Sequence, residues 1–245
     1  QEDWLQQQIA TRLKADANAV HYRILKKSVD ARSRNIKINL ELQAAVNEAL
    51  PARDLTVFNY QNVAQQKAVL IVGAGPAGMW AALRCLELGL KPIILERGKD
   101  VRTRRRDLKA ITRDNIVNPN SNYCFGEGGA GTYSDGKLYT RSKKRGSVKR
   151  ILDSLVQHGA VEDILYEAQP HIGTNKLPKI VQALRETILE FGGEVHFNTQ
   201  VTNILQKDQR IVGLETANGQ VFKGEATILA TGHSARDIFE LLHAQ

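Results

Sequence analysis

The chain has 245 residues, of which 42% are hydrophobic and 24% charged, and its formal net charge is +8 at pH 7. These values are ordinary for a globular protein and exclude a disordered or fibrous chain. The longest nearly apolar run, residues 69–83, contains three glycines and a proline, so a membrane-spanning helix is excluded there.

The first sixty residues predict a small α+β domain, residues 1–60. Apolar residues recur at helical spacing from Trp4 to Leu13, and HYRILKKSVDAR and NIKINLEL then alternate apolar and polar side chains as strands do. Because one helix and two strands bury little surface, we expect this domain to lack its first strand. Residues 61–67 are interpreted as a linker, and residues 68–245 as the main domain.

The chain begins Gln-Glu-Asp-Trp, without a basic region that leads into an apolar one, which indicates a cytoplasmic protein. Its only methionine is Met79, so the chain is interpreted as a piece of a longer protein. Cys85 and Cys124 lie too far apart for a C-x-x-C pair, and both are expected to be reduced thiols.

Residues 68–96 predict a βαβ unit. The expected elements are a buried strand at 68–72, a helix at 76–88 that ends at Gly89, and a second buried strand at 92–96. A further helix within KLPKIVQALRETILEFGG precedes short strands, with a hairpin signal at Asn218-Gly219. The expected fold class is therefore α/β: a Rossmann-like domain with a parallel sheet and an antiparallel meander, preceded by the small α+β domain.

The turn between the first strand and the helix of this unit reads GAGPAG, the dinucleotide-binding spacing. Gly73 allows a tight turn, Gly75 leaves room for a pyrophosphate, and Gly78 lets helix and strand pack closely. The helix then begins at the phosphates and offers them free N–H groups. Glu96 follows at the end of the next strand, where a carboxylate accepts hydrogen bonds from ribose hydroxyls. The alternative is a tight turn without a ligand.

A second glycine-rich stretch, FGEGGAGTYSDGKLYTR, matches the P-loop pattern at Gly131, Gly136 and Lys137. A P-loop requires a hydroxyl at the next position, a preceding strand and a following helix, whereas Leu138 follows here and neither element is predicted. We interpret the match as accidental.

Four stretches together carry a resemblance to a known family: RILKKSVDAR, GAGPAGMWAALRCLELGLKPIILERG, NPNSNYCFGEGGAGTYSDGKL and ILATGHSARDIFELL. From about Arg23 onward the chain resembles FAD-dependent dehydrogenases of the glutathione-reductase-like flavoprotein superfamily. The resemblance implies non-covalently held FAD, a glycine loop that approaches the flavin, a backbone contact to adenine at Val201, and an Ala-Thr-Gly turn beside the cofactor. Members continue well beyond the last of these stretches, so the cofactor domain is expected to be incomplete at its C-terminus.

The expected cofactor-binding residues combine the turn, the carboxylate, two arginines, the glycine loop and the segments that the resemblance adds. They are Gly73, Gly75, Pro76, Ala77, Gly78, Glu96, Arg97, Arg104, Gly128, Gly129, Ala130, Gly131, Val201, Ala230, Thr231 and Gly232. Arg97 and Arg104 are included because a guanidinium suits a diphosphate, although most arginines of the basic helix are expected to face water.

The sequence identifies no catalytic residue as clearly as it identifies the cofactor-binding turn. Asp135 and Lys137 are candidates because they are the titratable groups expected nearest the flavin, but a simple ion pair between them is the stronger interpretation. Cys124 is interpreted as a packing residue. His171 and His233 have no neighbouring carboxylate or cysteine cluster, so no metal site is expected.

The predicted function is that of an FAD-dependent oxidoreductase of unknown substrate, with NAD(P)H as a candidate electron donor. The alternative is a basic nucleic-acid-binding or RNA-modifying flavoprotein, because residues 97–150 contain fifteen Lys or Arg and only five Asp or Glu. Few aromatic residues accompany this charge, which argues against the alternative. A third interpretation is that the leading domain is a docking module for a partner protein. No membrane partner is expected, and oligomeric state and substrate are not determined by the sequence.

Overall fold

The computed structural model describes residues 2–138, 140 and 146–245, and the chain divides into two compact units. The first unit consists of residues 1–57 and 137–172, and the second of residues 58–136 and 173–245. The part of the chain that the structure describes contains no helix long and apolar enough to cross a membrane.

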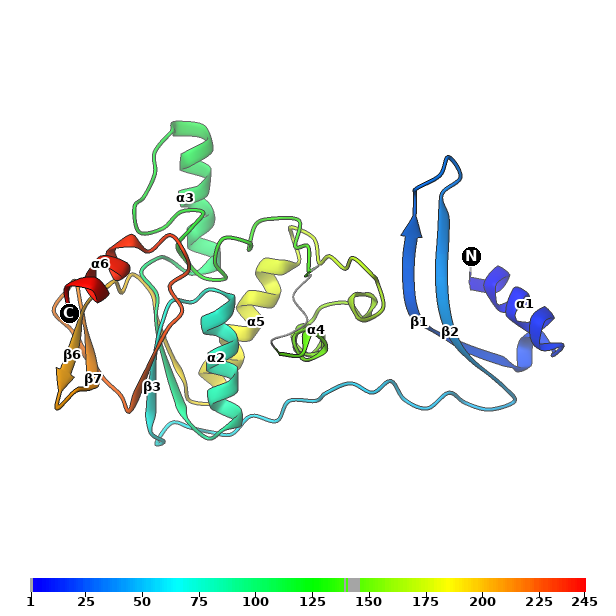
Figure 1. The fold of residues 1–245 in the computed structure, drawn as a ribbon, viewed down its shortest axis with the longest axis horizontal. Helices are drawn as coiled ribbons and strands as arrows, with labels where there is room; N and C mark the ends of the chain where they lie inside the picture. The colour runs from blue at the N-terminus through cyan, green and yellow to red at the C-terminus, as the bar shows by residue number, and fades with distance from the viewer. Residues whose placement is uncertain (1, 139, 141–145) are drawn as a thin grey trace. The chain divides into compact units, whose positions relative to one another are not determined.

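The first unit is built on an antiparallel hairpin of β1 (Val20–Asp30) and β2 (Lys37–Val46), preceded by α1 (Glu2–Leu13) and a 3-10 turn at Ala17–Ala19 (Figure 1). Ile9 and Ala10 of α1 pack on Val20 at the base of the hairpin. The predicted order of helix, strand and strand is confirmed. The unit also contains α4 (Val148–Gln157) and a 3-10 turn at Glu162–Leu165.

Backbone pairing connects the two separate stretches of the first unit. The Lys27 N–H donates to the Tyr166 carbonyl at 2.8 Å, and the Ala168 N–H donates to the Lys27 carbonyl at 2.9 Å. Arg53 and Glu162 add an ion pair at 3.8 Å. Residues 137–172 therefore pack with the leading domain, whereas the sequence analysis assigned them to the main domain.

The second unit has a four-stranded parallel sheet in the order β5-β4-β3-β9 (Figure 1). Its strands are β3 (Ala68–Val72), β4 (Lys91–Leu95), β5 (Glu194–His196) and β9 (Ala226–Leu229). An antiparallel meander follows β5 and consists of β6 (Val201–Lys207), β7 (Arg210–Thr216) and β8 (Val221–Lys223). The predicted α/β fold class, with a parallel sheet and a meander, is confirmed.

Helices cover one face of the parallel sheet and the meander covers the other. Alternate residues such as Leu70 and Leu95 form a buried cluster with Ile204 and Leu214 of the meander. On the helical side, α2 (Pro76–Glu87) contacts β3, β4 and α5 (Leu177–Glu190). The two central strands, β3 and β4, are buried along almost their whole length because both of their faces are covered.

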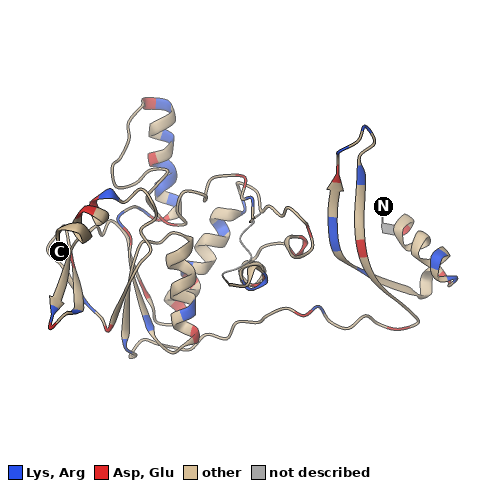
Figure 2. Cartoon of the chain, viewed as in Figure 1, with Lys and Arg blue, Asp and Glu red and all other residues tan. Residues whose placement is uncertain are grey.

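Two more helices and the linker complete the second unit. α3 (Val101–Asp114) follows β4, and α6 (Arg236–Ala244) follows β9. The linker is part of the unit rather than a free connection: the Val63 N–H donates to the Phe191 carbonyl at 2.8 Å, and Val63 is fully buried. Figure 2 marks the positions of charged residues along the ribbon of α3.

Candidate functional site

The turn between β3 and α2 is fixed by two glycines whose surroundings exclude a side chain. Gly73 has φ +106°, and a Cβ there would lie 2.6 Å from the Ala230 carbonyl oxygen. A Cβ on Gly78 would lie 1.9 Å from the Gly73 carbonyl oxygen. Gly75 differs, because its Cβ would meet nothing nearer than the Gly129 Cα at 3.9 Å. Gly73 and Gly78 therefore shape the turn, whereas the bare backbone at Gly75 leaves open space.

The N-terminus of α2 is suited to an anion. Pro76 is its first residue, and the first N–H with an acceptor in the helix is that of Met79, which donates to Gly75 at 3.0 Å. The N–H groups of Ala77 and Gly78 precede it and lack a helical acceptor by their position. The helix dipole adds partial positive charge at the same place.

A cavity of about 220 Å³ opens at this helix end, and we call it the glycine-loop cavity. Three chain segments meet around it, namely the turn at 73–77, the loop at 124–130 and the segment 230–234 after β9. It brings together ten of the residues expected from the sequence: Gly73, Gly75, Pro76, Ala77, Glu96, Gly129, Ala130, Ala230, Thr231 and Gly232. Cys124, Phe125 and His233 also line it and are not among the expected cofactor-binding residues. Cys124 is exposed, so the expectation that it packs in the interior is wrong.

The buried side chain of Arg104 stabilises the glycine loop through hydrogen bonds to its backbone. Its side chain is fully buried, and its guanidinium donates to five backbone carbonyls at 2.8–3.3 Å. These carbonyls belong to Asn122, Tyr123, Gly126, Glu127 and Gly129. This placement differs from the expected contact with a diphosphate, because the donors of Arg104 are directed at the loop backbone.

The carboxylate of Glu96 also accepts hydrogen bonds from backbone N–H groups of separate segments. Its Oε1 accepts from the N–H groups of Gly98 at 2.8 Å and Gly126 at 3.0 Å, and its Oε2 accepts from Ala74 at 2.7 Å. Since a carboxylate offers about four lone-pair sites, Oε2 retains capacity for one further donor. Glu96 thus connects the turn after β3 with the glycine loop, and it can still accept from one ligand hydroxyl.

A much smaller cavity of about 30 Å³, which we call the passage, adjoins the glycine-loop cavity at Glu96. Arg97 and Val201 line the passage, as does Asp237 of α6. Arg97 Nη1 donates to Asp237 at 3.0 Å, Nη2 donates to Asn120 at 3.1 Å, and the guanidinium lies 4.4 Å from the centre of the Phe125 ring. Its Nε is buried and has no hydrogen-bond partner among the described residues.

A third cavity, of about 340 Å³, lies next to the passage, and we call it the amide cavity. Asparagine side chains dominate its lining: Asn118, Asn120, Asn198 and Asn218, with Gln200 and Arg97. The amide groups among these side chains can both donate and accept hydrogen bonds.

The remaining predicted residues lie outside these three cavities. Gly128 packs inside the loop, where a Cβ would lie 2.2 Å from Thr132 Oγ1, and Gly131 is exposed with nothing within 4 Å of a Cβ. Lys137 belongs to the first unit, where its backbone pairs with His171. The Asp135 carbonyl accepts from the Gly173 N–H at 3.0 Å. Neither residue lines one of the three cavities, and their candidate catalytic roles stay predictions.

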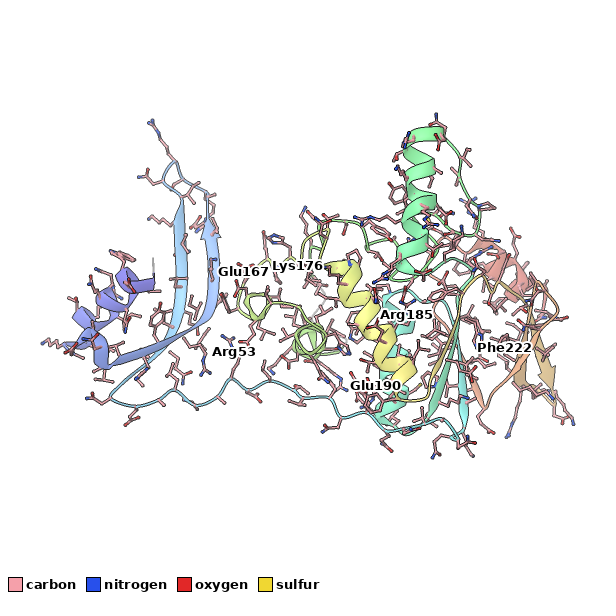
Figure 3. The ribbon with its side chains drawn as sticks, turned by 180° about the vertical axis from the view of Figure 1, so that it is seen from behind. Arg53, Glu167, Lys176, Arg185, Glu190 and Phe222 are labelled. Atoms are coloured by element: carbon pink, nitrogen blue, oxygen red, sulfur yellow. The ribbon has the colours of Figure 1, made fainter. Side chains whose placement is uncertain are left out.

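Glu127 is a buried carboxylate that sequence reasoning missed. Its Oε2 accepts from the Val101 N–H at the start of α3 at 2.6 Å, and its Oε1 lies 3.3 Å from Arg185 Nε. Figure 3 labels Arg185 on α5. Burial raises the pKa of Glu127 to about 7, although the Val101 N–H and the Arg185 charge oppose the shift. No sequence signal identifies it, because its partners come from two separate helices.

We expect Glu127 to make stability pH-dependent. The folded protein binds its proton more tightly than the unfolded chain, whose ordinary pKa is 4.5, so stability falls as pH rises from 4.5 to about 7. Glu127→Gln retains an acceptor for Val101 and cannot ionise. The free energy of unfolding of the variant, measured by urea denaturation, should therefore rise by about 3 kcal/mol relative to that of the wild type between about pH 5 and about pH 8. Equal pH dependence of the two proteins would contradict this assignment.

Three family models match parts of the chain: "Domain of unknown function (DUF8436)" at residues 1–45, "FAD binding domain" at residues 68–105, and "FAD dependent oxidoreductase" at residues 149–245. The FAD binding match covers β3, α2 and β4 with the start of α3. Together the two FAD models support the superfamily of FAD-dependent oxidoreductases and FAD as the cofactor.

Among relatives, an uncharacterized protein of Clostridium beijerinckii is 37% identical over 237 residues, which are 91% of this chain and 44% of that protein. A thiamine thiazole synthase of Aeropyrum pernix is 26% identical and covers 78% of this chain and 65% of its own length. The chain thus spans about half to two thirds of these relatives. The solved structure of THI4 from Thermovibrio ammonificans covers 74% of this chain and 62% of its own, with 16% identity and a TM-score of 0.48.

Proposed function

We propose that the protein is an oxidoreductase whose second unit holds FAD at the N-terminus of α2. The observation that carries the proposal is the convergence of the Gly75 turn, the glycine loop and the Ala230–Gly232 segment on one cavity at a helix end, where the first N–H groups have no acceptor within the helix. The bare backbone at Gly75 and the spare acceptor site of Glu96 fit a diphosphate and a ribose hydroxyl.

Each part of the chain has a separate task in this proposal. The N–H groups of Ala77 and Gly78 bind the pyrophosphate, and Glu96 Oε2 accepts from the ribose. Phe125, Ala130 and His233 line the same cavity beside the phosphate-binding turn. Bound FAD supplies the redox chemistry, and the protein orients it. NADH and NADPH are the electron donors to test; the substrate is open, and the cytoplasmic location stays a prediction.

The competing nucleic-acid interpretation draws on the basic segment 97–150, but several of its cations have internal partners. Arg104 is buried on carbonyls, Arg97 pairs with Asp237, and Lys99 lies 2.8 Å from Asp107. Fewer charges are therefore available to phosphates than the sequence count indicates. FAD binding remains the better-supported function.

Titration of the protein with FAD, followed by flavin fluorescence and visible absorbance, tests this proposal. We expect Gly75→Ala to fold normally and to bind FAD about 10- to 100-fold more weakly, because a methyl group separates the phosphates from charge-assisted N–H donors worth about 1.5–3 kcal/mol. Leu88→Ala, at the exposed far end of α2, is the matched control and should bind like the wild type.

Two results would overturn the proposal. The first is a folded wild-type protein that leaves the flavin spectrum unchanged at millimolar FAD, since even weak binding at that site would shift it. The second is equal affinity of the wild type and Gly75→Ala, which would place any bound FAD away from the turn.

A further inference from the structure

The passage is too small for the adenosine group of FAD, which the proposed function requires there. Its volume of about 30 Å³ is a small fraction of the 220 Å³ of the glycine-loop cavity. It shares Gly73, Glu96 and Phe125 with the glycine-loop cavity, and Arg97, Thr199 and Gln200 with the amide cavity. A dinucleotide with its diphosphate at α2 and its ribose at Glu96 would extend into this space.

The first turn of α6 narrows the passage. Asp237 accepts from Arg97 Nη1 at 3.0 Å and from Gln200 Nε2 at 3.1 Å, so one carboxylate connects the segment after β4 with the segment before β6. Ala235 and Ile238 are buried beside it, at 2% and 6% exposure. Arg97 is held from the other side by Asn120 and by the ring of Phe125.

The ion pair between Arg97 and Asp237 is weak enough to break. The Asp237 side chain is 39% exposed, which weakens an ion pair through solvent screening. Residue 235, at the start of α6, is an alanine and makes no side-chain capping hydrogen bond. The buried Nε of Arg97, unpartnered among the described residues, also makes the closed arrangement costly.

We infer that the Arg97–Asp237 ion pair, which we call the latch, closes the adenosine end of the dinucleotide site. FAD binds only after Asp237 of α6 has separated from Arg97. The inference rests on the proposed function. Asp237 is a positioning residue here, because it acts on the ligand through Arg97. Apparent affinity is proportional to the fraction of molecules in the open state, and association at high FAD is limited by the opening rate.

Stopped-flow flavin fluorescence at increasing FAD tests the latch. The wild-type rate should reach a plateau, and Asp237→Asn, which keeps the shape but loses the charge, should raise that plateau about tenfold, or about 1.4 kcal/mol. Asp237→Glu retains the charge and should restore a slow plateau. Glu240→Gln, an exposed change on the same helix, should match the wild type. Circular dichroism establishes that each variant is folded.

The possible outcomes separate the latch from the proposed function. FAD binding with equal plateaus in the wild type and Asp237→Asn would overturn the latch and leave the FAD site intact. Slower or weaker binding in Asp237→Asn would also overturn it, because the pair would then hold adenosine. Absence of FAD binding in all folded variants would reject the proposed function itself.

Discussion

Replacing Arg104 with alanine should lower the free energy of unfolding by about 3–5 kcal/mol. The guanidinium is fully buried and donates to five carbonyls of residues 122–129. Its loss leaves an internal cavity and removes the donor for Asn122 and Tyr123, whose carbonyls have no other acceptor role among the hydrogen bonds described. Urea denaturation measures the change, and amide hydrogen exchange should be fastest in the glycine loop.

The neighbouring arginines provide the control. Arg105 and Arg106 lie on the same helix and are exposed, so Arg105→Ala and Arg106→Ala should stay within about 0.5 kcal/mol of the wild type. Arg104→Lys should recover only part of the loss, because an ammonium has three donors and lacks the planar geometry of a guanidinium. If Arg104→Ala and Arg105→Ala were equally stable, Arg104 would not be the support of this loop.

The βαβ unit could be predicted closely because its signals are local. The expected first strand at 68–72 coincides with β3, and the expected helix at 76–88 differs from α2 by one residue at its end. A run of apolar residues, a glycine turn and Gly89 as a stop define these elements without reference to the rest of the chain.

Roles that depend on distant partners could not be predicted in the same way. Sequence reasoning assigned Glu96 to ribose, whereas the structure adds three backbone donors, one of them thirty residues away at Gly126. Arg104 was selected among the five arginines of α3 for a diphosphate, and its actual role could not be predicted, since the buried position depends on where the glycine loop packs. Asp237 lies 140 residues from Arg97, and no spacing rule connects them.

The division into units failed to follow the expected boundaries for a related reason. Composition marks a linker near residue 60, but strand pairing between Lys27 and residues 166–168 brings the later segment to the leading domain. Such pairing uses backbone groups, which every residue has, so side-chain patterns do not report it.

Gly78→Ala is expected to destabilise the protein by at least about 3 kcal/mol, although alanine is the better helix former by about 1 kcal/mol. The added Cβ would lie 1.9 Å from the Gly73 carbonyl oxygen and 3.4 Å from the Ile71 side chain. A backbone oxygen in a tight turn cannot move aside as a flexible side chain can, so α2 would have to separate from β3. Urea denaturation of the variant and the wild type measures the loss.

Gly75→Ala provides the sharpest comparison, because it makes the same chemical change three residues earlier in the same turn. There the new Cβ would lie 3.9 Å from the Gly129 Cα, which is an ordinary contact, so the free energy of unfolding should change by less than about 0.5 kcal/mol. Equal stability of the two variants would mean that close packing of α2 on the turn is not what requires Gly78. The expected outcome instead separates the two glycines: Gly78 is needed for folding, and Gly75 for the approach of the ligand.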